Sequence, residues 1–128
     1  MNSDLFSYVD FEELYLKLIS KNADMVIAST EYRVDIPFAV FKTKKNKIKS
    51  LEEKPSYAYN SNAGIYIFKK EVLDIIPKNK FINITDVMDK LIDQGSELIH
   101  HPIIGYWIDI GNPKDFKKAQ ETLKHFIP

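Results

Sequence analysis

The sequence predicts a mixed α/β fold, in which helices pack against a sheet. The first observation is that short apolar runs, typical of strands, loosely alternate with segments of helical apolar spacing. The second is the size and composition, 128 residues with 45% hydrophobic and 28% charged, which suit a single domain over residues 1–128 with one core. The third is that the sequence has only four glycines and lacks the Gly-rich phosphate loop that a complete doubly wound sheet commonly contains. We therefore expect the chain to be part of a larger domain.

The first predicted element is a helix that begins after Asp10. Asp10 is a suitable N-cap, and Glu13 stands three residues later, as in a capping box. Asn22 is expected to end the helix, and the apolar run of residues 23–29 is expected to form a buried strand. The predicted apolar stripe of this helix is Phe11, Leu14, Tyr15, Leu18 and Ile19.

The remaining elements follow from apolar runs, caps and turn residues. We expect a hairpin of residues 37–42 and 48–51, whose lysine-rich tip is either solvated or an anion site, and strands at 65–68, 97–99 and within 104–110. A short helix at 70–76 should end at Pro77, and a second helix should start at Asn83 or Thr85 and end before Gly95. Asn112-Pro113 should open the last helix, with a buried stripe of Phe116, Ala119, Leu123 and Phe126.

The segment from Leu51 to Phe68 carries the clearest pattern of a binding site. A charged strand end, residues 51–54, stops at Pro55, which we expect to hold Lys54 extended, and a polar loop of residues 56–61 follows. Gly64 permits a close backbone approach or a bulge where the next strand begins. Such a layout can hold an anionic, polyhydroxylated ligand, with Glu53 accepting from hydroxyls and Lys54 meeting a phosphate; the alternative is a plain cluster of surface charges.

Two isolated carboxylates, Asp4 and Asp109, stand at predicted element ends. Ligands of open α/β sheets bind at strand ends, and Mg²⁺ takes one or two carboxylates and completes its shell with water and phosphates. The alternative is that Asp4 is solvated and Asp109 caps a turn. His100 and His101 are neighbours on a strand and should point to opposite faces, so we interpret them as structural. We interpret Trp107 as a core residue rather than a stacking platform.

Composition excludes several classes of function. The net charge is zero and a single arginine is present, so the sequence does not indicate a nucleic-acid partner. The sequence has no cysteine, which excludes disulfides and fits a reducing compartment, and no apolar run approaches the roughly 18 residues of a membrane span.

Four motifs in order resemble the sugar-1-phosphate nucleotidyltransferases. They are LEEKP at 51–55, NAGIYIF at 62–68, YWIDIGNPKDFKKAQ at 106–120, and Asn2-Ser3-Asp4 with the helix after it, which is similar to the metal-bearing NGD segment of the family. Residues 62–64 and 106–111 most resemble the guanylyltransferase-like members of the family, such as those acting on mannose 1-phosphate. The resemblance implies a partial Rossmann-like mixed sheet with flanking helices, the C-terminal half of the nucleotide-diphospho-sugar transferase fold.

The resemblance also implies a role for each matched residue. Asp4 and Asp109 correspond to the two Mg²⁺-binding aspartates, Glu53 to the glutamate that binds sugar hydroxyls, and Lys54 to the lysine that contacts the sugar phosphate. Two further residues, Asn62 and Gly64, correspond to residues lining the sugar pocket. The sequence departs from the family pattern at Ala39 and Ser3, where the family often has glycine.

The implied reaction joins a sugar 1-phosphate to a nucleoside triphosphate, in the cytoplasm, with release of pyrophosphate. In the family a Gly-rich loop precedes the NGD segment and binds the nucleotide, and here nothing precedes Met1. We therefore expect the sugar-binding half of such an enzyme, inactive by itself, and a homo-oligomer formed through an apolar sheet edge beside residues 23–29. The alternative is a non-catalytic binding or assembly module that retains part of the fold.

Overall fold

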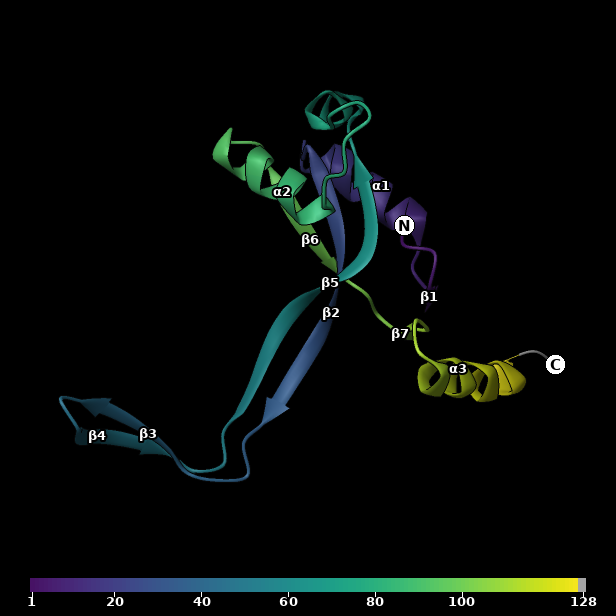
Figure 1. Ribbon diagram of the computed structural model, residues 1–128. Helices are drawn as coiled ribbons and strands as arrows, with labels where there is room; N and C mark the ends of the chain where they lie inside the picture. The colour runs from purple at the N-terminus through teal and green to yellow at the C-terminus, as the bar shows by residue number, and fades with distance from the viewer. Residues whose placement is uncertain (127–128) are drawn as a thin grey trace. The chain divides into compact units, whose positions relative to one another are not determined.

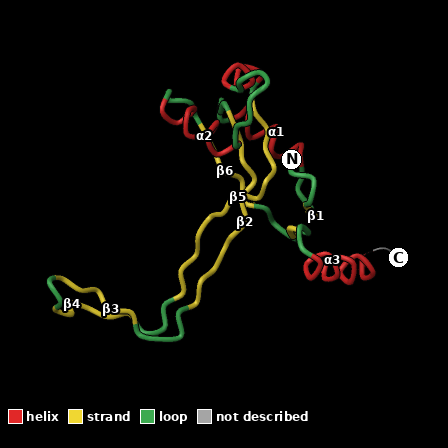
Figure 2. Tube along the Cα trace, viewed as in Figure 1, coloured by secondary structure: helices red, strands yellow, loops and turns green. Residues whose placement is uncertain are grey.

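The computed structural model describes residues 1–126, and the side chains of Leu123, His125 and Phe126 are outside that description. The predicted burial of Leu123 and Phe126 therefore falls outside the described side chains. Figure 1 labels the elements and Figure 2 shows the same trace by secondary structure. In chain order they are β1 (Leu5–Ser7), α1 (Phe11–Ser20), β2 (Met25–Asp35), β3 (Val40–Lys44), β4 (Lys47–Glu52), β5 (Ser56–Phe68), the 3₁₀ helix η1 (Lys70–Ile75), α2 (Ile84–Asp93), β6 (Leu98–Pro102), β7 (Trp107–Asp109) and α3 (Pro113–Phe126).

The chain divides into two compact units. The first unit comprises Met1–Thr30 and Asn62–Pro128, and the second comprises Glu31–Ser61. Strands β2 and β5 contribute residues to both units. The expectation of a single domain stays a prediction.

The sheet of the first unit has the strand order β5-β2-β6. Strand β2 runs parallel to β6, with the register extending from Met25 opposite Leu98 to Ser29 opposite Pro102. The predicted bare apolar edge beside residues 23–29 is therefore wrong. Because β5 and β6 flank it, β2 is the central strand, and its side chains at Met25, Val26 and Ala28 are fully buried.

The core of the first unit lies on both faces of β2. Successive side chains of a strand point to opposite faces, so Val26 and Ala28 face one way and Met25 faces the other. Val26 and Ala28 belong to an apolar cluster with Leu14 and Leu18 of α1. Met25 belongs to a second cluster, with Val72 of η1 and with Val87 and Leu91 of α2. The mixed α/β fold with helices against the sheet is thus confirmed.

Helix α1 begins where the sequence predicts. The Asp10 carboxylate accepts hydrogen bonds from the backbone N–H groups of Glu12 and Glu13, at 2.8 and 3.3 Å. Asn22 follows the helix in a left-handed conformation, with φ of 48°. The apolar stripe is narrower than predicted. Leu14 and Leu18 are buried, whereas Phe11, Tyr15 and Ile19 are about half exposed.

The later helices also start and stop at the predicted residues. Asn112 accepts hydrogen bonds from the backbone N–H groups of Lys114 and Asp115 at the start of α3. Gly95 follows α2 with φ of 78°, the left-handed conformation expected of a glycine after a helix. The segment predicted as a helix at 70–76 is the 3₁₀ helix η1. None of the described helices is both long and apolar enough to span a membrane.

The second unit contains the predicted hairpin. Strands β3 and β4 pair antiparallel, from Val40 opposite Glu52 to Lys44 opposite Lys47. The two residues at the tip, Lys45 and Asn46, have φ of 48° and 63°, as in the two-residue turn that matches the twist of a hairpin.

Candidate active site

Strands β1 and β7 bring Asp4 and Asp109 together from the two ends of the chain. The two strands pair antiparallel, with Leu5 opposite Asp109. Just beyond the ladder, the Ile110 N–H donates to the Asp4 carbonyl at 2.8 Å. The backbone thus places residue 4 beside residues 109 and 110, although more than 100 positions separate them in the sequence.

The carboxylates of Asp4 and Asp109 meet beside Gly111. A Cβ added to Gly111 would lie 3.0 Å from Asp109 Oδ1 and 3.2 Å from Asp4 Oδ2. The separation of the two oxygens is therefore no larger than the sum of these distances. Both aspartates are exposed, and Gly111 leaves the space beside them open. Two accessible carboxylates fit Mg²⁺, which takes one or two of them and completes its shell with water and phosphate oxygens.

No larger metal site is present in the part of the chain that the structure describes. Within residues 1–126, no group of three or more His, Cys, Asp or Glu side chains could hold a metal ion. The described donor set is thus a carboxylate pair, which suits a metal that is shared with a phosphorylated substrate. The metal-binding role of Asp4 and Asp109 stays a prediction.

The segment Asn62-Ala63-Gly64 lies next to the residues that precede Asp4. The Asn2 N–H donates to the Gly64 carbonyl at 2.9 Å. The Gly64 N–H donates to Asn62 Oδ1 at 2.8 Å, and Asn62 Nδ2 donates to the Tyr66 hydroxyl at 3.0 Å. Gly64 has φ of 76°, and an added Cβ would come within 2.8 Å of the Asn2 amide, so only glycine fits this approach.

Sequence reasoning missed the part that Trp107 takes in this arrangement. We expected Trp107 to be a core residue, and its ring does pack against the cluster under α1. Its indole N–H also donates to the Ala63 carbonyl at 2.9 Å and so joins β7 to the Asn62–Gly64 segment. The available signal was chemical, because a buried indole N–H requires an acceptor.

A basic residue beside Asp109 was also missed. Lys118 of α3 lines the same surface hollow as Asp109, with Tyr106 and Trp107 on its wall. Helical spacing from the N-cap Asn112 could have placed Lys118 near the start of the helix, but nothing in its immediate sequence distinguishes it from the neighbouring lysines.

Glu53 and Lys54 belong to the second unit, whereas Asp4, Asp109, Asn62 and Gly64 belong to the first. Both side chains are exposed, and they follow the end of β4 at Glu52. The predicted extended conformation of Lys54 is wrong, because its φ is 43°. The chain bends between β4 and β5, and a left-handed residue at this bend still avoids the right-handed helical region that Pro55 disfavours.

Two further details of this segment differ from the prediction. The predicted loop at residues 56–61 is the first half of strand β5. The charged residue with defined partners is Glu52 rather than Glu53. Glu52 accepts a hydrogen bond from the Tyr57 hydroxyl at 3.0 Å and forms an ion pair with Lys42, and the Lys42 hydrogen bond and then the Tyr57 bond lower the pKa of its carboxyl. Glu53 is thus the carboxylate of the pair that is open to a ligand.

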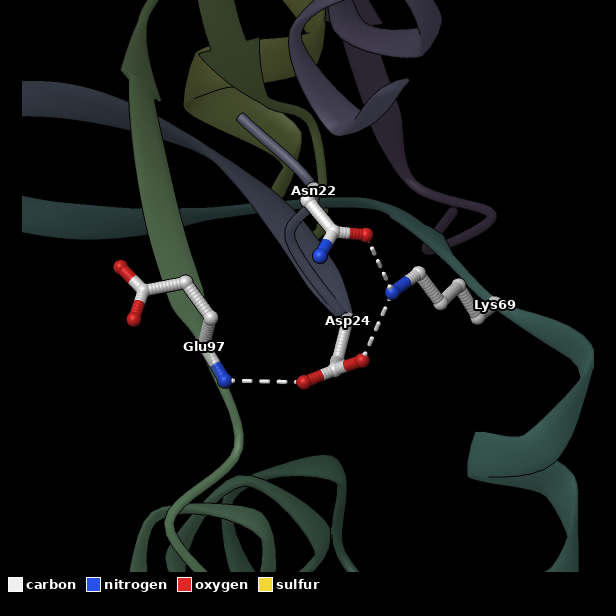
Figure 3. A network of polar contacts seen from close by, with 4 residues as sticks. All are labelled: Asn22, Asp24, Lys69 and Glu97. Atoms are coloured by element: carbon white, nitrogen blue, oxygen red, sulfur yellow. Dashed lines mark hydrogen bonds and ion pairs between the residues drawn. The ribbon is translucent and has the colours of Figure 1, made fainter. Parts of the chain in front are cut away.

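A separate polar network ties the strand starts of the first unit together (Figure 3). The Asp24 carboxylate accepts from the Glu97 N–H at 2.9 Å and from Lys69 Nζ at 3.0 Å, and Lys69 also donates to Asn22. The Glu97 N–H bond, followed by the Lys69 bond, lowers the pKa of Asp24. These contacts join the beginnings of β2 and β6 to the end of β5, so we interpret the network as structural.

The two histidines of β6 contact different elements. His100 Nδ1 lies 2.9 Å from the Ser29 hydroxyl of β2, and His101 Nε2 lies 3.6 Å from the Glu13 carboxylate of α1. The contacts agree with the predicted opposite faces and with structural roles.

The fold is mixed α/β with an exposed carboxylate pair, and the comparisons with known proteins identify the family. The family model described as nucleotidyl transferase matches residues 1–125. This chain belongs to the nucleotidyl transferase family.

Individual relatives are identical to this chain at about 30% of the aligned residues. The chain is 29% identical to mannose-1-phosphate guanyltransferase beta-A of Xenopus laevis, over 91% of this chain and 33% of that protein. It is 31% identical to glucose-1-phosphate adenylyltransferase of Bacillus cytotoxicus, over 96% of this chain and 36% of that protein. The chain thus spans about a third of the length of these two relatives.

A solved structure shows the same fold. HddC from Yersinia pseudotuberculosis is similar with a TM-score of 0.63 and 24% identity, over 96% of this chain and 53% of that chain. A structure described as a putative glucose-1-phosphate thymidylyltransferase from Bacillus anthracis is similar with a TM-score of 0.64 and 23% identity, over 93% of this chain and 51% of that chain. The predicted similarity of the fold to part of a nucleotidyltransferase structure is thus confirmed.

Proposed function

We propose that this chain supplies the sugar-phosphate and metal side of a sugar-1-phosphate nucleotidyltransferase active site. The observation that carries the proposal is the Asp4–Asp109 pair, which meets beside Gly111 and is linked through Asn2 to the Asn62–Gly64 segment. Both relatives described above act, by their names, on a sugar 1-phosphate, one on mannose 1-phosphate and one on glucose 1-phosphate. The sugar phosphate, rather than one sugar or one base, is what they share.

Each site residue then has a defined task. Asp4 and Asp109 would hold Mg²⁺, which neutralises phosphate charge and joins the phosphates when bound. Lys54 offers a mobile cation to the sugar phosphate, and Glu53 accepts hydrogen bonds from sugar hydroxyls. Lys118, beside Asp109, is a further cation available to a phosphate group. In the reaction of this class, a phosphate oxygen of the sugar 1-phosphate attacks the α-phosphorus of the triphosphate and pyrophosphate leaves, so the residues act mainly by positioning and by charge.

We propose three further properties of this chain. The sequence of 128 residues contains no Gly-rich loop, so we assign no turnover to this chain by itself. Exposed aromatic and aliphatic side chains on α1 and on the hairpin, such as Tyr15 and Phe41, make self-association an expected property. The composition, with no cysteine, suits the cytoplasm.

The proposal is tested by titrating the chain with mannose 1-phosphate, glucose 1-phosphate and inorganic phosphate, each with Mg²⁺ and followed by calorimetry or NMR. Loss of a charge-assisted hydrogen bond costs on the order of 1.5–3 kcal/mol, so Lys54→Ala should weaken binding of all three ligands roughly tenfold or more. Glu53→Ala should weaken the two sugar phosphates and leave inorganic phosphate unchanged, because only the sugars carry hydroxyls for Glu53 to bind.

The matched control is Lys49→Ala, which removes another exposed lysine of the second unit, on β4. It should bind all three ligands as the unaltered chain does. Equal affinities in Lys54→Ala, Glu53→Ala and Lys49→Ala would remove the second unit from the sugar-phosphate site.

A further inference from the structure

Gly111 stands at the point where the two carboxylates approach. Its N–H donates to Asp109 Oδ1 at 2.8 Å. The position of its missing Cβ is 3.0 Å from that same oxygen and 3.2 Å from Asp4 Oδ2. Gly111 therefore forms a hydrogen bond to one carboxylate through its backbone N–H. The position where a side chain would begin borders both carboxylates.

The backbone conformation of Gly111 does not itself require glycine. Three glycines of the chain have left-handed φ values, Gly64 at 76°, Gly95 at 78° and Gly105 at 120°, and Gly111 is not among them. An alanine could adopt the backbone of residue 111 without strain. The neighbours that a Cβ would meet most closely are the Asp109 and Asp4 carboxylate oxygens.

We propose that Gly111 is a positioning residue for the Asp4–Asp109 pair. Its N–H fixes the orientation of the Asp109 carboxylate, and its lack of a side chain keeps open the space that one divalent cation needs to reach both carboxylates. This inference rests on the proposed function, because it concerns the same carboxylate pair, but it assigns a role to a residue that is not itself a ligand.

The distances between residue 111 and the two carboxylates are small. A methyl group at residue 111 would lie closer to both oxygens than nine in ten real Cβ contacts, so each carboxylate would move by a few tenths of an ångström. Exposed carboxylates can move that far with little cost to the fold. Mg²⁺ demands near-ideal octahedral geometry, and metal sites depend on groups that orient the ligands, so the same displacement should be felt in metal affinity.

The substitution Gly111→Ala isolates this effect. It keeps the backbone N–H and hence the hydrogen bond to Asp109, and it adds only the methyl group. The matched control is Gly95→Ala, at a residue where an added Cβ meets nothing within 4 Å but φ is 78°. Gly95→Ala should lower the melting temperature through backbone strain and leave the carboxylate pair unchanged.

The experiment is a titration of the 128-residue chain with Mn²⁺ alone, in which the free ion is measured by electron paramagnetic resonance. The unaltered chain and Gly95→Ala should bind Mn²⁺ equally, Asp109→Asn should lose that binding, and Gly111→Ala should weaken it roughly tenfold or more, as expected when a group that orients a ligand is disturbed. Circular dichroism should show that Gly111→Ala melts within about a degree or two of the unaltered chain, because its backbone conformation accepts alanine.

The possible failures are distinguishable. Normal Mn²⁺ binding by Gly111→Ala, combined with loss in Asp109→Asn, would overturn the role of Gly111 and leave the metal site intact. Equal binding by the unaltered chain and Asp109→Asn would overturn both the metal site and this inference. A Gly111→Ala chain that does not fold would show that glycine serves the backbone there, which also overturns it.

Discussion

Asp24 is the residue whose charge matters most clearly to the stability of the first unit. Its carboxylate accepts one backbone and one lysine hydrogen bond, and these bonds hold the pKa of Asp24 below its ordinary value. A carboxyl with a lowered folded-state pKa stabilises the fold above its unfolded-state pKa, about 3.9, and loses that contribution as the pH falls toward the folded-state value. The effect should therefore be complete at neutral pH and absent in strong acid.

We predict that Asp24→Asn lowers the free energy of unfolding at pH 7 by about 1 kcal/mol, the usual net value of a hydrogen bond. The ion pair adds little, because the Asp24 and Lys69 side chains are 34% and 36% exposed. Urea denaturation between pH 7 and pH 2 should show the two curves converging below about pH 4. The control is Asp93→Asn, a change of an exposed aspartate at the end of α2, which should alter the free energy of unfolding at pH 7 by less than about 0.5 kcal/mol. A constant difference down to pH 2 would contradict the assigned ionisation.

At this scale, sequence patterns identified residue types better than their neighbours in space. The motif resemblance selected Asp4 and Asp109, but only the β1–β7 ladder explains how residues so far apart in the chain meet. Lys54 was mispredicted because the restriction before proline disfavours one backbone region and does not choose between those that remain. For Trp107 the sequence predicted a place in the core but not the hydrogen bond to the Ala63 carbonyl, because the identity of a hydrogen-bond acceptor cannot be predicted from local sequence.

Among the elements, α1 depends on its N-terminal cap. The Asp10 carboxylate accepts hydrogen bonds from two N–H groups that have no partner within the helix. Leu14 and Leu18 pack the helix against the sheet. Asp10→Ala should lower the free energy of unfolding by about 1 kcal/mol and the melting temperature by a few degrees. Asp10→Asn should lose much less, because asparagine is an equally good cap. Equal losses in the two variants would show that the charge of Asp10, rather than its capping bonds, stabilises the helix.

Helix ends were predictable because caps and left-handed residues are local signals. Asp10, Asn22, Gly95 and Asn112 all act where the sequence places them. The first half of β5 was not predictable, because residues 56–61 are polar and lack the apolar alternation of a half-buried strand. Pairing within the fold, rather than local preference, makes that segment a strand.

At the scale of the whole molecule, segments from near the two ends of the chain, β1 and β7, pair and place the Asp4–Asp109 pair. Residues near the N-terminus pair with β7 and contact Gly64, so the Asp4–Asp109 pair and the Asn62–Gly64 segment lie within a single unit. The apolar run of residues 23–29 and the helical stripes predicted the layers of this unit. The strand order could not be predicted by the same means, because local periodicity carries no information about which strands pair.

The most direct test of the account is the position of a metal in crystals of this chain soaked with Mn²⁺ and mannose 1-phosphate. The anomalous signal of Mn²⁺ locates the ion without reference to activity. We predict one ion within coordination distance of both the Asp4 and the Asp109 carboxylates, at roughly 2.0–2.3 Å from each, with a phosphate oxygen in its shell. An ion bound by only one of these aspartates, or a sugar phosphate bound away from them, would contradict it.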